Sequence, residues 1–157
     1  MKQITSLLLT LTLMIGAGNN AVAQNVTADI ASLREAAERG DAEAQYDLGN
    51  CYYDGNGVVY DFIEAAKWYT LAAETFAHSQ CRLGECYYKG LGVTQDFTEA
   101  IKWFREAANS NHVEALKYLS DCYRHGNGVP QDVEKANELR YKADYQEALN
   151  RRNSRRR

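Results

Sequence analysis

Apolar residues along this chain recur at helical spacing, in pairs of segments separated by short turns. Ala44, Leu48 and Tyr52 follow one another at intervals of four, which places them on one face of a helix. A second stripe of this kind begins after residue 60 and contains Ala65 and Ala72. No segment alternates apolar and polar residues with the period of two that a half-buried strand shows. The pattern therefore predicts an all-α chain.

The helix-turn-helix pattern occurs three times. The phrase that begins at Leu48 returns at Leu83 and, in altered form, at Leu119, with offsets of 35 and 36 residues. A repeat of this length is typical of a helical solenoid, in which each unit stacks on its neighbours. We expect an N-terminal capping helix over residues 24–40, repeat one over 41–76, repeat two over 77–111, and repeat three with a C-terminal capping helix over 112–149.

Each predicted turn contains residues that end one helix and start the next. Gly55 and Gly57 suit the left-handed backbone that closes a helix. Asp61 stands three residues before Glu64, which is an Asp-led version of the capping box at a helix start. The corresponding pairs in the other units are Asp96 with Glu99 and Asp132 with Lys135.

Twelve positions of each unit make up the repeated signature. In the first unit they are Ala44, Leu48, Gly49, Tyr52, Gly55, Gly57, Val58, Asp61, Ala65, Trp68, Ala72 and Ala73. The second unit matches with Ser79 at the first position. The third has Ser120 for the first glycine and Leu139 for the tryptophan, and it keeps Ala115, Leu119, Tyr123, Gly126, Gly128, Val129, Asp132 and Ala136. Over residues 41–145 the chain resembles the Sel1-like repeat family, whose members are relatives of the tetratricopeptide repeats. The resemblance implies a right-handed α–α solenoid of about three repeats, and both ends of the chain look like polar capping helices.

The resemblance also implies that the first helices of the repeats line a concave face. The residues expected on that face lie opposite the apolar stripe. They are Glu43, Tyr46, Asn50 and Tyr53 in repeat one, His78, Cys81, Glu85 and Tyr88 in repeat two, and Glu114, Lys117, Asp121 and Arg124 in repeat three. Tyrosines beside charged residues suit the binding of another protein or an extended peptide. For any single residue, an ordinary solvated face is the alternative.

These features favour a non-enzymatic interaction module that acts as an adaptor, regulator or inhibitor. The alternatives are a periplasmic immunity protein against a secreted effector enzyme, and a cell-wall or β-lactam hydrolase. The family branch to which β-lactam hydrolysis has been attributed places cysteine pairs at the turns between units. This chain has Ala73 and Gln80, or Ala108 and Leu116, at those turns. No serine has a nucleophile-elbow signature, so the sequence does not support a hydrolase.

The cysteines predict neither disulfides nor a metal site. Cys51, Cys86 and Cys122 occupy the same position of successive repeats, roughly 10 Å apart, whereas a disulfide needs Cα atoms within about 7 Å. We expect them to be small buried apolar residues. Cys81 stands in the register of Tyr46, and a reactive thiol or an intermolecular disulfide is the alternative for it. No four ligands converge for zinc, and no cofactor is expected.

Residues 1–23 resemble an export signal. Lys2 precedes an apolar segment from Ile4 to Ala17, and Ala21-Val22-Ala23 supplies the small residues that a signal peptidase reads. We therefore expect a mature chain that begins at Gln24 and is exported, to the periplasm of a Gram-negative bacterium or to the medium.

Charge is distributed unevenly over the rest of the chain. Between Gln24 and Asn150, 12 Lys and Arg stand against 21 Asp and Glu, a net charge of −9. An acidic body argues against a nucleic-acid partner, because phosphates bind cationic surfaces. Residues 150–157 have no apolar side chain and are expected to form a disordered basic tail, whose arginines are Arg151, Arg152, Arg155, Arg156 and Arg157. The tail could contact an anionic membrane, lipopolysaccharide or an acidic partner, or dock on its own acidic body.

Overall fold

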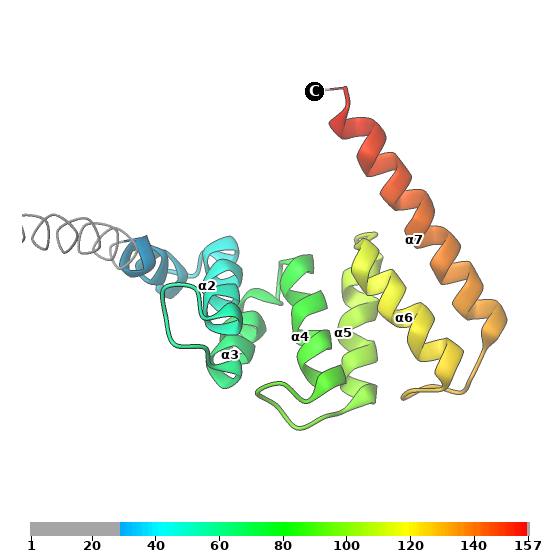
Figure 1. Cartoon of the computed structure of the whole chain (residues 1–157), viewed down its shortest axis with the longest axis horizontal. Coiled ribbons are helices and arrows are strands. Elements are labelled where there is room, and N and C mark those ends of the chain that lie inside the picture. The colour runs from blue at the N-terminus through cyan, green and yellow to red at the C-terminus, as the bar shows by residue number, and fades with distance from the viewer. Residues whose placement is uncertain (1–28, 157) are drawn as a thin grey trace, which may run out of the picture.

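The computed structural model describes residues 29–156, and all regular structure within that range is helical. Its complete helices are α2 (Ala42–Asp54), α3 (Phe62–Ala72), α4 (Ala77–Lys89), α5 (Phe97–Asn109), α6 (Val113–His125) and α7 (Val133–Ser154). The expected export signal (1–23), the first residues of the expected capping helix (24–28) and Arg157 lie outside the described residues. The helices form the successive pairs α2/α3, α4/α5 and α6/α7, which stack side by side as an α–α solenoid (Figure 1). No helix within 29–156 is long and apolar enough to cross a membrane.

The predicted helix ends are confirmed, with one exception. Gly55, Gly90 and Gly126 close the first helix of each pair in the left-handed conformation. The Asp61 carboxylate accepts hydrogen bonds from the N–H groups of Ile63 and Glu64 at the start of α3. The expected return bond from Glu64 to the Asp61 N–H is absent. That N–H donates instead to the Tyr52 carbonyl at 2.8 Å, and Glu64 pairs with Lys67. The capping box is therefore only half formed.

The second glycine of the turn lies where neighbouring repeats touch. A Cβ added to Gly92 would lie 1.9 Å from the carbonyl oxygen of Phe62, at the start of α3 in the preceding repeat. A Cβ on Gly128 would lie 2.8 Å from the backbone of Phe97 at the start of α5. These two glycines are required by the stacking of repeats as well as by their positive φ angles.

A third glycine position explains one departure in the last repeat. A Cβ on Gly49 would meet the Tyr69 ring at 2.6 Å, and one on Gly84 would meet the Phe104 ring at 2.7 Å. In the third unit the residue in the register of these rings is Arg140, which is exposed. Ser120 then fits the space, and its hydroxyl donates to the Ala136 carbonyl at 2.7 Å.

The core consists of small and aromatic residues that continue from one repeat to the next. Alanines allow close helix packing, and the largest fully buried side chains are Tyr69 and Phe104. Cys86 and Cys122 are buried and Cys51 is half-buried, and all three are free thiols. The prediction of small buried residues at this register is confirmed for the first two and only partly for Cys51.

Residues 29–38 are helical and pack against α2 as a second helix of a preceding repeat would. Ala37 is buried with Ala44 and Leu48. Arg34 Nη2 donates to the Tyr52 hydroxyl at 2.7 Å, and Arg105 on α5 makes the same bond, at 2.9 Å, to Tyr123 of the next repeat. The described part of the expected capping helix therefore copies the contacts of a second helix.

The junction between repeats one and two differs from the others. Gly40 and Asn111 adopt positive φ angles at the two longer junctions, whereas residues 73–77 contain no such residue. Phe76 takes the N-cap position of α4 and provides no side-chain hydrogen bond. The junction from Ala73 to Ser79 is one residue shorter than those from Ala37 to Ala44 and from Ala108 to Ala115, and the residue that it lacks is the left-handed one.

Helix α7 corrects the expected disorder of the basic tail. The helix continues to Ser154, so residues 150–154 are ordered helix rather than disordered tail. Glu147 accepts from Arg151 at 2.6 Å, one helical turn later, and this i,i+4 pair supports the extension.

One buried hydroxyl gives a prediction for stability. Ser79 is fully buried, and its Oγ has no hydrogen-bond partner within residues 29–156, while the equivalent residues are Ala44 and Ala115. Ser79→Ala is expected to raise the free energy of unfolding by about 1 kcal/mol, because an unsatisfied polar group leaves the core. Ser120→Ala is the matched control and should lower it by a similar amount, because its hydrogen bond is lost. Urea denaturation measures both, and a destabilised Ser79→Ala would contradict the assignment.

Candidate functional site

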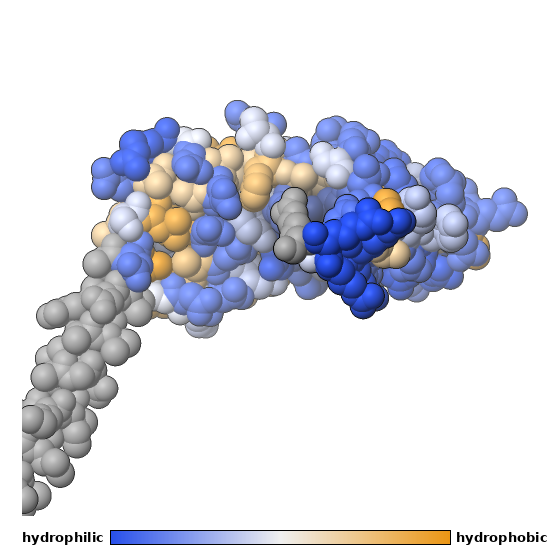
Figure 2. Space-filling model, turned by 90° about the horizontal axis from the view of Figure 1, so that it is seen from above, coloured by the Kyte–Doolittle hydropathy of each residue, from blue (hydrophilic) through white to orange (hydrophobic). Residues whose placement is uncertain are grey.

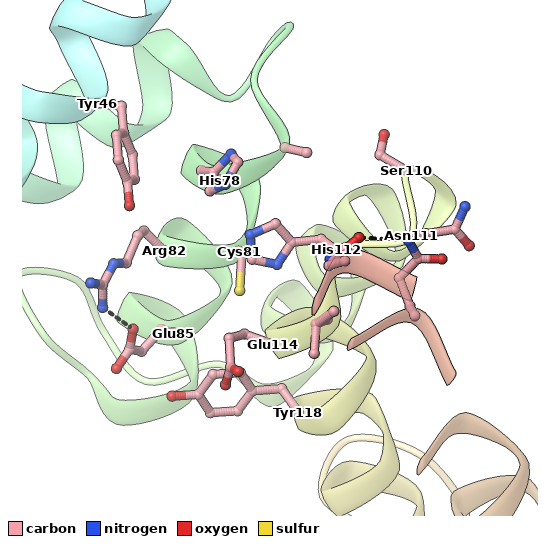
Figure 3. A pocket seen from close by; sticks show the side chains of 14 residues that line it. Tyr46, His78, Cys81, Arg82, Glu85, Ser110, Asn111, His112, Glu114 and Tyr118 are labelled. Carbon is pink, nitrogen blue, oxygen red and sulfur yellow. Dashed lines mark hydrogen bonds and ion pairs between the residues drawn. The ribbon is translucent and has the colours of Figure 1, made fainter. Parts of the chain in front are cut away.

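A pocket of about 740 Å³ lies between repeats two and three, on the side of the molecule formed by the first helices (Figure 3). We call it the inter-repeat pocket. Helix α4 supplies one wall, the α5–α6 turn and α6 supply the opposite wall, and α2 and α7 contribute at the ends. Its lining residues are Tyr46, Ala77, His78, Cys81, Arg82, Glu85, Ser110, Asn111, His112, Val113, Glu114, Tyr118, Gln146 and Asn150.

An ion-pair network lies at one end of the pocket. Glu85 is only 7% exposed, and its carboxylate accepts from Arg82 at 2.9 Å and from Lys89 at 2.6 Å. Burial alone would raise the pKa of Glu85, but the hydrogen bonds from Lys89 and Arg82 outweigh it and lower that pKa. Burial likewise opposes the charge of Arg82, yet the Glu85 carboxylate raises its pKa. All three groups are therefore charged, with a net charge of about +1 beside the pocket.

Aromatic rings form a continuous wall across the repeats. Tyr46 packs edge-on against Phe76 at 5.4 Å between centroids, and Phe76 lies 5.0 Å from the His78 ring. His78 in turn meets His112 of the next repeat at 4.8 Å, edge to face. Figure 3 shows Tyr46, His78 and His112 bordering the same space. This wall offers flat apolar surface with polar ring edges, as protein-binding sites often do.

His112 has a structural role as well. It is the N-cap of α6, where its Nδ1 accepts from the Ala115 N–H at 3.4 Å. Burial and, after it, the neighbouring His78 lower the pKa of His112 to about 4; Glu114 opposes them, and Arg82 adds a smaller lowering effect. The ring is therefore neutral near pH 7, and Nδ1 is free of a proton there.

The Cys81 thiol and the Tyr118 hydroxyl of the pocket are unsuited to nucleophilic chemistry. Burial raises the pKa of the Cys81 thiol to about 12, so it is protonated at neutral pH, and the reactive-thiol alternative for Cys81 loses its chemical basis. Burial also raises the pKa of Tyr118 to about 12. Among residues 29–156 no group of three or more His, Cys, Asp or Glu side chains is placed to hold a metal ion.

The structure divides the predicted concave-face residues into three groups. Those that line the inter-repeat pocket are Tyr46, His78, Cys81, Glu85 and Glu114. Those that take part in packing beside it are Asn50, Tyr53 and Tyr88. Those outside the pocket are Glu43, Lys117, Asp121 and Arg124.

The packing group corrects part of the sequence interpretation. Asn50 accepts from the buried Tyr69 hydroxyl at 2.9 Å. The Arg82 guanidinium lies 5.4 Å from the centre of the Tyr53 ring. The Tyr88 hydroxyl accepts a hydrogen bond at 3.0 Å from Asn127, which lies in the turn between α6 and α7. Tyr53 and Tyr88, expected to be free anchors for a partner, are thus already engaged within the protein.

Sequence reasoning missed several residues of the pocket. Arg82 follows Cys81, and Tyr118 follows Lys117. Each is turned by about 100° around its helix from the predicted residue, and both line the inter-repeat pocket. His112 could have been found from its register, because it occupies the N-cap position that Asp41 holds in repeat one. Gln146 and Asn150 come from the last turns of α7, and no repeat pattern predicted their return to this face.

Comparisons with known proteins give a consistent result. A family model described as Sel1 repeat matches residues 42–74, 77–112 and 113–143. The crystal structure of c5321, a protective antigen of uropathogenic Escherichia coli with an SLR fold, is 38% identical over 77% of this chain and 26% of its own, with a TM-score of 0.75. A Sel1 repeat protein from Oxalobacter formigenes is 31% identical over 76% of this chain and 50% of its own, with a TM-score of 0.72. The chain therefore spans about a quarter of the first of these structures and about half of the second. No curated protein matches it.

Proposed function

This chain belongs to the Sel1 repeat family, whose members generally mediate protein–protein interaction, and we propose that it binds a partner protein or an extended peptide in the inter-repeat pocket. In this role it is a non-enzymatic adaptor, regulator or inhibitor. The family is typically a scaffold, and the protonated Cys81 thiol and the neutral His112 of the same pocket support a binding role over a catalytic one.

The observation that carries the proposal is the composition of the pocket walls. The rings of Tyr46, His78 and His112 supply apolar contact area with little side-chain entropy to lose. Beside them, Ser110, Asn111, Gln146 and Asn150 can each donate and accept hydrogen bonds. A backbone segment of a partner needs both kinds of group, because its own N–H and C=O groups must stay paired when they leave water.

Affinity capture with matched variants tests the proposal. The pocket variant is His78→Ala/Glu114→Ala/Asn150→Ala, whose three residues are exposed and whose removal should change stability little. The control variant is Thr70→Ala/Glu106→Ala/Asn137→Ala, which removes one hydroxyl, one carboxylate and one amide outside the pocket. We expect the wild type and the control to capture the same partner and the pocket variant to lose it. Equal capture by all three would refute the site.

We further propose that the protein acts outside the cytoplasm, on the strength of the signal-like residues 1–23. An exported location would place its partner in the periplasm or the medium, as an immunity or inhibitor role requires. Fractionation of cells that express the chain, together with the N-terminal sequence of the recovered protein, decides this. A protein that starts at Met1 and stays in the cytoplasm would overturn it.

A further inference from the structure

The end of α7 and the turn after it have a basic side that does not line the inter-repeat pocket. Arg152 and Arg156 are four residues apart, and so are Arg151 and Arg155. Arg151 and Arg152 lie in the last turn of α7, and Arg155 and Arg156 lie in the turn that follows its end at Ser154. With Ala148 they border a single shallow depression of about 460 Å³. We call these four arginines the basic face. Arg151 is paired with Glu147, whereas Arg152, Arg155 and Arg156 form no ion pair within residues 29–156.

Two exposed tyrosines continue this face toward the middle of α7. Tyr141 is 74% exposed and Tyr145 is 57% exposed, which is unusual for large aromatic side chains. Spacings of four and seven connect Tyr141, Tyr145 and Arg152, so these three lie along one side of α7, and Arg156 follows four residues later in the turn after the helix. Aromatic rings with a polar tip, next to arginines, are the residues that favour the boundary between lipid and water.

The position of this segment makes it accessible. The end of α7 extends beyond the stacked helices (Figure 1), and in the view from above it faces the viewer as a strongly hydrophilic surface (Figure 2). A projecting helix end can approach a flat surface without interference from the rest of the molecule. Residues 24–150 have a net charge of −9, so an anionic surface would attract the tip and repel the remainder.

We propose that the basic face, with Tyr141 and Tyr145, docks the protein on an anionic phospholipid surface. The helix lies obliquely, with Arg152, Arg155 and Arg156 at the headgroup phosphates and the two tyrosines at the interface. This orientation turns the acidic body outward and leaves the inter-repeat pocket open to a partner. The inference does not depend on the proposed function of the pocket, because its variants and its readout are different.

Vesicle sedimentation with the full chain tests the proposal. The probes are vesicles of phosphatidylcholine alone and of phosphatidylcholine with an equal amount of phosphatidylglycerol. The basic-face variant is Arg152→Gln/Arg155→Gln/Arg156→Gln. The charge-matched control is Lys67→Gln/Lys102→Gln/Lys135→Gln, whose residues are exposed or half-buried and lie elsewhere. The apolar residues 4–17 are common to all three proteins; binding to phosphatidylcholine vesicles measures their contribution, which is subtracted from the binding to phosphatidylglycerol vesicles.

The expected result is that the wild type and the control bind phosphatidylglycerol vesicles and that the basic-face variant binds about 100-fold more weakly, at roughly fivefold per charge. Binding of the wild type should weaken as salt is added, and Tyr141→Ser/Tyr145→Ser should also weaken it. Equal binding of the two charge variants, or equal binding of the wild type to both kinds of vesicle, overturns the proposal. A second result would also overturn it: the wild type does not bind vesicles but self-associates, and the basic-face substitutions abolish that self-association. The basic face would then bind the acidic body of a second copy.

Discussion

Replacement of Gly92 by alanine is expected to destabilise the protein by about 3 kcal/mol or more. Two separate penalties act at this position. The residue has a φ angle of +71°, which costs an L-amino acid roughly 1–2 kcal/mol. The added Cβ would also lie 1.9 Å from the Phe62 carbonyl oxygen, so repeats one and two would have to move apart. Urea denaturation measures the total loss.

The neighbouring turn glycine provides the control. Gly90 has almost the same φ angle, +72°, but its nearest contact to an added Cβ is the Gln95 side chain at 3.3 Å. Gly90→Ala should therefore cost only the backbone penalty. If the two alanine variants were equally stable, repeat stacking would not depend on the close approach at Gly92.

Lowering the pH from about 6.5 to 4 is expected to reduce the free energy of unfolding by about 2 kcal/mol through His112. Its pKa is about 4 in the folded protein and about 6.5 in the unfolded chain. Below pH 6.5 the unfolded chain therefore binds a proton that the folded protein does not, and stability falls until the pH reaches the folded pKa. The full difference between the two pKa values would correspond to a larger loss of the free energy of unfolding. Partial exposure of the His112 ring to solvent reduces that loss.

The variant His112→Asn isolates this contribution. Asparagine does not titrate, and its side-chain oxygen can still cap α6. The free energy of unfolding, measured by denaturation at each pH, should be similar for the wild type and the variant above pH 7. Toward pH 4 the two values should diverge, with the wild type losing more stability. Parallel curves over the whole range would show that His112 is not buried and neutral as the structure places it.

Local features of the fold were predictable from the sequence. The helix pairs, the closing glycines and the capping aspartates depend on residues within a few positions of one another, and each repeat supplies an independent copy of the pattern. The sequence also located Tyr46, His78, Cys81, Glu85 and Glu114 on the face that forms the pocket.

Features that depend on contacts between repeats were not predictable in the same way. The role of Gly92 follows from the position of Phe62 in another repeat, and the Tyr88 hydroxyl is engaged by an asparagine 39 residues away. The basic tail was expected to be disordered because it lacks apolar residues. Its first residues instead continue a long helix that is already formed by packing of Ala136 and Ala143.

The affinity of the captured partner for the pocket and control variants tests the central claim most directly. Titration calorimetry with purified partner should give equal dissociation constants for the wild type and for Thr70→Ala/Glu106→Ala/Asn137→Ala. For His78→Ala/Glu114→Ala/Asn150→Ala we expect at least a tenfold weaker affinity, about 1.4 kcal/mol or more, with unchanged helicity. An affinity that falls for the control variant and not for the pocket variant would place the binding surface on the second helices and contradict the account.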